Sequence, residues 1–154
     1  MYSIRNAKIE DRDECLRIQH QNGIQSDEYL WDEYKWAFVL NNLYDSWVLI
    51  HDEKVVGYAV GLIRTITEQD YFPSDLQGEI GWYYMDLCVE KPHRHEGTDT
   101  IVSFVNDRYP LNYAHIQVDN IGVWKAAIRN GWEKVGLVKN YFDSGDAYTI
   151  INDQ

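Results

Sequence analysis

The chain has 154 residues, a length typical of one domain, and no stretch has the composition of a linker, so we expect a single domain over residues 1–154. Hydrophobic residues make up 45% and charged residues 25% of the sequence, which excludes a disordered chain. No apolar run is long enough to cross a bilayer, so no membrane partner is expected. With 14 Lys and Arg against 25 Asp and Glu, the net charge of −11 repels polyanions and argues against a nucleic-acid partner.

The N-terminal segment lacks the basic start and the apolar middle of a secretory signal, so a cytoplasmic location is expected. Cys15 and Cys88 stand singly, without CxxC spacing and without His residues at metal-ligand spacing. We therefore predict two reduced thiols, no disulfide framework and no metal site. The negative charge could steer amine substrates or serve only solubility, and the sequence is compatible with a homodimer.

The first half of the chain predicts a strand, two helices and a hairpin. Residues 2–7 alternate weakly, and a helix follows that Asp11 or Asp13 could cap. Apolar residues in the segment 27–42 largely share one helical face, which predicts a second helix. In residues 46–65, two runs of β-branched and aromatic residues flank a short polar turn, a pattern typical of a β-hairpin.

The second half alternates strands and helices. Residues 79–89 predict a strand, residues 98–109 a helix after Pro92, and residues 112–118 another strand. A further helix is predicted over residues 120–130, closed by Gly131, and a final antiparallel pair over 132–141 and 146–151.

This order of elements predicts an α/β (α+β) domain with a mixed central sheet of about six or seven strands, flanked by about four helices. A helix that follows one strand and leads into another is typical of a crossover between parallel strands. We therefore expect a parallel pair between the strand that ends near Val89 and the strand around Ala114.

Three stretches resemble the GNAT superfamily of N-acetyltransferases, and the resemblance covers nearly the whole chain. Residues 83–89 followed by PHRHEGTD at 92–99 resemble the strand and the R/Q-x-x-G-x-G/A loop of that family. Residues 115–120, with Gly131-Trp132 downstream, resemble its Asn and Gly-Phe positions. Residues 140–148 look like the last hairpin of the protein N-terminal acetyltransferases. The resemblance implies the GNAT fold, acetyl-CoA as a co-substrate and an amine acceptor, either a peptide N-terminus or a small molecule.

The resemblance also implies a cofactor site. A loop at a helix start presents free backbone N–H groups, which suit the pyrophosphate of coenzyme A. The residues implied there are Arg94, His95, Glu96, Gly97, Thr98, Asp99 and Thr100. Backbone amides of Leu87, Cys88 and Val89 would hold the pantetheine arm and polarise the thioester carbonyl. Asn120 would contact the cofactor arm, although an Asn there could equally be an ordinary helix cap.

For the chemistry, the resemblance implies Tyr83 and His115 as proton acceptors that act through water, and neutral His has a suitable pKa. Asp86 is a second candidate base. Ala127 stands where the family often has a Tyr that protonates the thiolate, so Tyr84 is a candidate replacement that could also face the substrate. Tyr141 would line the peptide slot.

Each of these residues also has a purely structural reading. Tyr83 and Tyr141 could be ordinary strand aromatics, and His115 an exposed residue opposite the buried Ile116. Asp86 could be solvated or face the substrate, and Cys88 could be a small apolar strand residue.

Asp99 stands where the family places Gly or Ala, and Glu96 adds a second acid nearby. At an effective dielectric of about 20, one like charge at about 4 Å costs on the order of 4 kcal/mol, more than a hundredfold in affinity. Alternatively, Asp99 caps the helix and points away from the cofactor. The sequence thus leaves three readings, of which the first is an N-acetyltransferase and the second a degenerate GNAT-fold binding module that no longer binds acetyl-CoA. In a third reading, an aromatic helix near Trp31 and Trp36 serves as an interaction surface.

Overall fold

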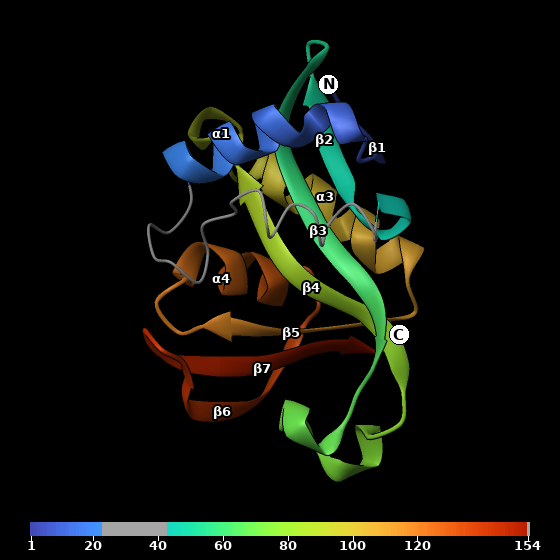
Figure 1. Cartoon of the computed structure of the whole chain (residues 1–154), viewed down its shortest axis with the longest axis vertical. Helices are drawn as coiled ribbons and strands as arrows, with labels where there is room; N and C mark the ends of the chain where they lie inside the picture. The colour runs from blue at the N-terminus through green and yellow to red at the C-terminus, as the bar shows by residue number, and fades with distance from the viewer. Residues whose placement is uncertain (23–42, 154) are drawn as a thin grey trace. The chain divides into compact units, whose positions relative to one another are not determined.

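The computed structural model describes residues 1–22 and 43–153 (Figure 1). Seven strands form a mixed sheet in the order β1-β2-β3-β4-β5-β7-β6, which confirms the predicted sheet. The helix predicted over residues 27–42, which carries Trp31 and Trp36, lies outside the described residues. Within the described part of the chain, no helix combines the length and the apolar composition that a membrane span needs.

The chain forms two compact units. The first unit comprises Met1–Leu62 with Met85–Ile101, and the second comprises Ile63–Tyr84 with Val102–Gln154. Strand β3 (Lys54–Thr65), strand β4 (Ile80–Val89) and helix α3 (Glu96–Arg108) each contribute residues to both units. The single domain expected from the sequence stays a prediction.

In the first unit, β1 (Tyr2–Asn6), β2 (Trp47–His51) and β3 pair antiparallel, in agreement with the predicted hairpin. The turn between β2 and β3 is formed by Asp52 and Glu53, whose φ angles are 49° and 65°. Positive φ at both central residues matches the right-handed twist of the flanking strands, so this tight turn fixes the hairpin register.

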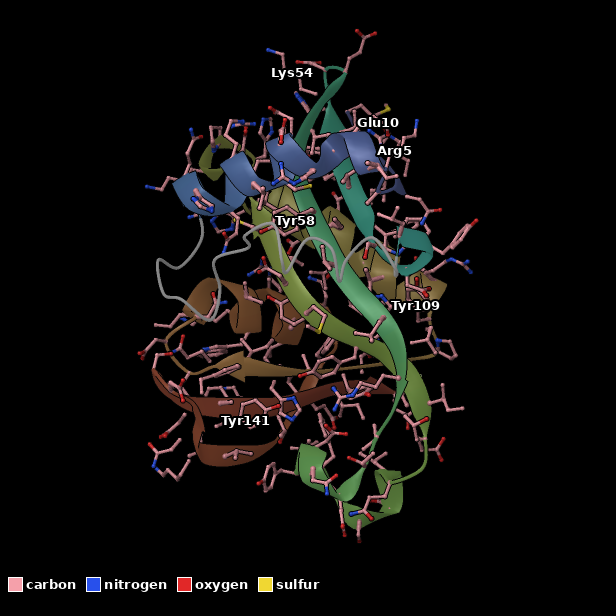
Figure 2. The ribbon with its side chains drawn as sticks, in the orientation of Figure 1. Arg5, Glu10, Lys54, Tyr58, Tyr109 and Tyr141 are labelled. Atoms are coloured by element: carbon pink, nitrogen blue, oxygen red, sulfur yellow. The ribbon has the colours of Figure 1, made fainter. Side chains whose placement is uncertain are left out.

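Helix α1 (Arg12–Asn22) packs on this hairpin through Cys15 and Ile18. The buried cluster beneath it includes Val48 from β2 and Tyr58 from β3 (Figure 2). The cluster also contains Ala7, Val55, Val60 and Cys88. Arg5 donates two hydrogen bonds to the Asp11 carboxylate, at 2.7 and 2.9 Å, and Asp11 also accepts one from the backbone N–H of Lys8. Asp11, one of the two expected caps, therefore fixes the turn just before α1 begins.

The second unit contains β5 (Leu111–Gln117), α4 (Ile121–Arg129), β6 (Glu133–Phe142) and β7 (Gly145–Asp153). Strands β4 and β5 pair parallel at Trp82–Asn112 and Tyr83–Tyr113, which confirms the expected crossover pair. Strand β7 lies antiparallel to β5 on one side and to β6 on the other, as the last predicted pair requires (Figure 1).

Gly81 allows β4 to approach β5 closely. A Cβ at this position would lie 2.8 Å from the Leu111 carbonyl oxygen and 2.9 Å from Leu111 Cγ. Backbone cannot move aside as a flexible side chain can, so the parallel register at Trp82 depends on the missing side chain.

We therefore predict that Gly81→Ala lowers the free energy of unfolding by about 1–3 kcal/mol, the usual cost of overpacking. Urea unfolding at equilibrium measures the change. The matched control is Gly122→Ala in α4, where an added Cβ meets no atom within 4 Å among the described residues. The control should be neutral or stabilising by up to about 1 kcal/mol. Equal effects of the two variants would contradict the packing argument.

Candidate functional site

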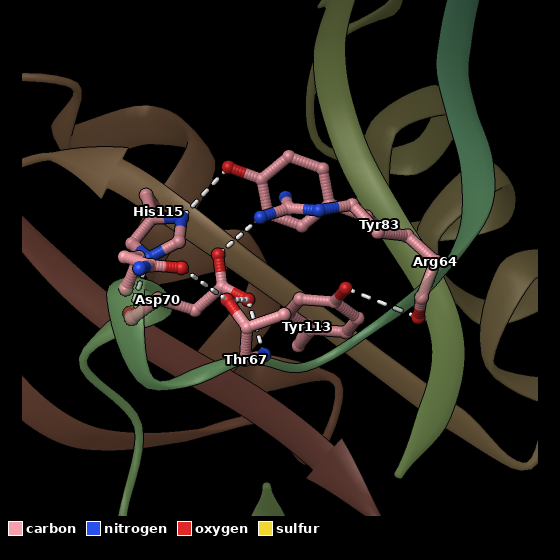
Figure 3. A network of polar contacts seen from close by, with 7 residues as sticks. Arg64, Thr67, Asp70, Tyr83, Tyr113 and His115 are labelled. Atoms are coloured by element: carbon pink, nitrogen blue, oxygen red, sulfur yellow. Dashed lines mark hydrogen bonds and ion pairs between the residues drawn. The ribbon is translucent and has the colours of Figure 1, made fainter. Parts of the chain in front are cut away.

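A network of polar contacts in the second unit includes His115 (Figure 3). His115 lies on β5 and is 4% exposed. Its Nδ1 atom is 2.7 Å from the hydroxyl oxygen of Tyr83 on β4, and its Nε2 atom is 2.7 Å from the backbone carbonyl oxygen of Asp70. The structure thus brings together the two residues that the sequence singled out as proton acceptors. The alternative that His115 is exposed is wrong.

The carbonyl of Asp70 determines which nitrogen of His115 carries the proton. A carbonyl oxygen can only accept, so Nε2 is the N–H donor. Neutral imidazole has a single N–H, which leaves Nδ1 as an acceptor for the Tyr83 hydroxyl. Burial lowers the pKa of His115, which favours this neutral form at pH 7. The hydrogen bonds therefore run in one direction, from Tyr83 through His115 to Asp70.

A cation lies against the ring of Tyr83. The guanidinium carbon of Arg64, on β3, is 4.2 Å from the ring centroid, and this guanidinium forms an ion pair with the Asp70 carboxylate. Burial, together with the neighbouring Tyr141 phenol, raises the pKa of Tyr83, whereas Arg64 opposes the rise. Tyr83 is therefore a neutral phenol at pH 7 that donates its proton to His115. The adjacent Tyr113 hydroxyl donates to the carbonyl oxygen of Arg64 at 3.1 Å.

The segment between β3 and β4 places Asp70. Its carboxylate accepts a hydrogen bond from the backbone N–H of Thr67 at 2.7 Å, which closes the short helical turn Glu68–Asp70. Phe72 is buried, and its ring contacts His115 edge-on, with centroids 5.5 Å apart. Sequence reasoning missed Arg64 and Asp70, because this segment showed only turn-forming residues. The available signal was Thr67-x-x-Asp70, the spacing of a capping box.

Tyr141, on β6, also belongs to this site. Its ring stacks on His115, with centroids 4.3 Å apart and planes 11° from parallel. Tyr71 contacts Tyr141 edge-on at 6.4 Å and is itself exposed. Tyr84 is different, because adjacent strand residues point to opposite faces, and it lies buried on the other face of β4 from Tyr83. The structure therefore brings Tyr141 to the pair but not Tyr84.

Asp86 and Cys88 lie in the first unit and are both buried. The hydroxyl of Tyr58 donates to the Asp86 carboxylate at 2.6 Å, so the reading of Asp86 as a solvated acid is wrong. Burial raises the pKa of Cys88 to about 12, so its thiol stays protonated and unreactive. Among the described residues, His, Cys, Asp and Glu form no group of three that could hold a metal ion.

The start of α3 has the features of an anion site, with two exceptions. The first helical bond joins the Asp99 N–H to the His95 carbonyl oxygen at 2.8 Å, so the amides of residues 96–98 lack an intrahelical acceptor. Arg94 adjoins them and donates to the Val89 carbonyl oxygen at 3.1 Å. The two exceptions are Glu96 and Asp99, acidic residues of this first turn whose negative charge would repel an anion.

Gly97 and Asp99 have different surroundings from those expected. A Cβ on Gly97 would lie 3.0 Å from Leu49 Cδ2, so this glycine permits close packing of α3 against β2. Asp99 is the fourth residue of α3, and His95 precedes the helix with a φ of 73°. Asp99 therefore does not occupy the N-cap position, so the expected capping role is wrong, whereas the direction of its side chain relative to a cofactor stays a prediction.

Asn120 occupies the N-cap position of α4, but its side chain forms no capping hydrogen bond. The ordinary capping role is therefore not realised in the described part of the chain. Its proposed contact with a cofactor stays a prediction.

No protein-family model matches the sequence, and no curated protein sequence matches it. Solved structures do match along the whole chain. Naa50 of Arabidopsis thaliana, in complex with the bisubstrate analogue CoA-Ac-MVNAL, is 15% identical with a TM-score of 0.75, and the match covers 99% of each chain. NAA60 of Arabidopsis thaliana, in complex with acetyl-CoA, is 15% identical with a TM-score of 0.74 and covers 100% of each.

The ribosomal-protein-S18-alanine N-acetyltransferase of Escherichia coli is 12% identical, with a TM-score of 0.68, and the match covers 98% of this chain and 92% of that one. Acetyltransferases of the GNAT family are also among the similar structures, for example one from Bacillus cereus. Likeness at this level of identity shows a fold and leaves activity open. The chain therefore has the GNAT fold, which it shares with Naa50, NAA60 and the GNAT-family acetyltransferase of Bacillus cereus.

Proposed function

We propose that this chain is an N-acetyltransferase that moves the acetyl group of acetyl-CoA to a primary amine, by direct attack in a ternary complex. The observation that carries the proposal is the directed hydrogen-bond chain of Tyr83 and His115. Because burial lowers its pKa, His115 is neutral at pH 7, and its Nδ1 lone pair can accept the proton of the Tyr83 hydroxyl. The acceptor is a peptide N-terminus or a small-molecule amine, and the bisubstrate analogue CoA-Ac-MVNAL bound by the similar structure of Naa50 favours the peptide.

The first step concerns the acceptor amine, which is protonated in water and must lose a proton before it can attack. Its proton passes, directly or through one water, to the hydroxyl oxygen of Tyr83. Tyr83 simultaneously gives its own hydroxyl proton to Nδ1 of His115, along the 2.7 Å hydrogen bond. The products of this step are a neutral amine and an imidazolium whose Nε2–H remains bonded to Asp70.

The acyl transfer itself needs few side chains. The neutral amine nitrogen forms a bond to the thioester carbonyl carbon, the carbon–sulfur bond breaks, and the thiolate takes up the proton released by nitrogen. The imidazolium of His115 then releases its proton to water, by way of Tyr83, before the next turnover. A thiolate is a good leaving group, since the thiol pKa is about 8.5. Backbone N–H groups polarise the carbonyl in this scheme, and we assign that role to Leu87, Cys88 and Val89 on β4.

The first turn of α3 would bind the pyrophosphate through the amides of residues 96–98, with Arg94 adding positive charge. The acids Glu96 and Asp99 lower the affinity without removing the amide donors. These two acids are also the observation that favours a second candidate function, a GNAT-fold binding module that does not take up acetyl-CoA.

We predict that the protein binds acetyl-CoA with a micromolar Kd, and that Asp99→Ala binds it about 5- to 10-fold more tightly. The gain corresponds to removal of roughly 1 kcal/mol of screened repulsion. Calorimetric titration at low and moderate salt measures both values. The matched control is Asp107→Ala, which removes an exposed acid from the far end of the same helix and should leave the Kd unchanged.

Two outcomes of this titration would count against the enzyme. Binding only in Asp99→Ala would favour the second candidate function. Failure of every variant to bind would show that the assignment of the α3 turn is wrong.

We further predict that kcat falls as the pH drops through the pKa of His115, because only the neutral imidazole accepts a proton. Burial lowers that pKa, so the midpoint should lie below about 6.5, the usual value for His. Tyr83→Phe and His115→Gln should each reduce kcat by about 10²–10⁴-fold. Initial rates from pH 5 to 8 provide the test, with the exposed Tyr44→Phe as control. Wild-type rates in both variants would refute the assigned roles.

A further inference from the structure

We propose that Asp70 is a positioning residue of this site: its backbone carbonyl holds His115 as the Nε2–H tautomer, and its carboxylate holds Arg64 against Tyr83. The catalytic part of this inference rests on the proposed function. The structural part concerns only the state of His115 and can be tested without any reaction.

The tautomer of His115 decides whether Tyr83 has an acceptor. In the Nε2–H form, the Nδ1 lone pair faces the Tyr83 hydroxyl 2.7 Å away. In the Nδ1–H form, two donors would face each other there, and the Asp70 carbonyl would lose its donor. A buried carbonyl that loses its donor is destabilising, which disfavours the Nδ1–H form. The position of one backbone oxygen therefore determines whether the proton path from Tyr83 exists.

The carboxylate of Asp70 acts on Tyr83, the partner of His115, because it holds Arg64 against the Tyr83 ring. Its side chain is 2% exposed, so the negative charge requires a partner, and Arg64 supplies it. The ion pair holds the guanidinium 4.2 Å from the Tyr83 ring centroid. The guanidinium thereby holds the Tyr83 ring in place, and with it the hydroxyl that faces Nδ1 of His115.

Asp70 can bind His115 and Arg64 at the same time because the turn that carries it is held by hydrogen bonds. The Thr67 N–H binds the carboxylate at 2.7 Å, and the Asp70 N–H donates to the Thr67 carbonyl oxygen at 3.1 Å. Phe72 anchors the following residues by packing on Tyr113 and His115, with ring centroids at 5.4 and 5.5 Å. The titratable and charged groups that face His115 from these elements are Arg64, Asp70, Tyr83, Tyr113 and Tyr141.

Nitrogen-15 NMR of the imidazole rings tests the structural part. In the wild type we expect one slowly exchanging ring N–H, assigned to Nε2 of His115 by its loss in His115→Gln. Asp70→Ala removes both the turn closure and the ion pair, so this N–H should exchange rapidly or disappear. Asp70→Asn keeps a side-chain oxygen for Thr67 and should retain it. The matched control is Asp75→Ala, an exposed acid of the same segment, which should behave as wild type.

Kinetics test the catalytic part. Asp70→Ala should lower kcat about 10- to 100-fold, as misplacement of a catalytic group does, with no change in the KM for acetyl-CoA. Asp70→Asn should recover part of the loss. In a Tyr83→Phe background, Asp70→Ala should cost nothing further, because residues that act through one another are not additive.

The outcomes separate the two proposals. A wild-type spectrum without a protected Nε2–H, or Asp70→Ala with an unchanged one, would overturn the positioning role whether or not the protein is an enzyme. A full additional loss of kcat in the Tyr83→Phe background would show that Asp70 acts on the whole fold instead. If no variant transfers acetyl groups but the N–H responds as expected, the positioning role stands and the proposed enzyme does not.

Discussion

Strand β5 is buried along its whole length, so its polar side chains are withdrawn from water and depend on partners inside the second unit. Asn112 donates to the Tyr109 carbonyl oxygen, although its own Oδ1 has no hydrogen-bond partner among the described residues, and Gln117 donates to the Ser144 hydroxyl. His115 has two ring nitrogens to satisfy, and it does so with one donor and one acceptor. The same requirement that stabilises the strand therefore also fixes the protonation state of His115. A candidate catalytic group arises here from an ordinary constraint on buried polar atoms.

The constraint extends from β5 to the connection between β3 and β4. Asp70 meets the needs of three groups: the imidazole of His115, the guanidinium of Arg64 and the amide of Thr67. Each of these contacts restricts the position of the others, since networks of buried hydrogen bonds and ion pairs are cooperative. The connection between β3 and β4 thereby becomes part of the site. The conformation of this connection, together with the pairing of β4 and β5, determines how Tyr83 and His115 face each other.

Local patterns predicted most of the fold, because hydrophobic periodicity and turn residues act over short distances. The β2–β3 hairpin and the parallel β4–β5 pair followed from such patterns. The pairing of Tyr83 with His115 came from resemblance. The contact of His115 with Asp70 joins residues 45 positions apart and uses a backbone carbonyl, which every residue possesses, so it has no sequence signature. The burial of His115 was missed because alternation assumes one exposed face, whereas β5 is covered on both.

At the start of α3, helix stability and anion binding place opposite requirements on the residues of the first turn. Acids in the first turn favour the helix by about 0.3–1 kcal/mol each, since they face the positive end of the helix dipole. An anionic ligand at the same end would draw on the same dipole and the same free amides. Glu96 and Asp99 therefore stabilise the free protein at the expense of anion affinity. Whatever anion binds here must gain enough from the amides of residues 96–98 and from Arg94 to overcome that competition, so its affinity should depend strongly on salt.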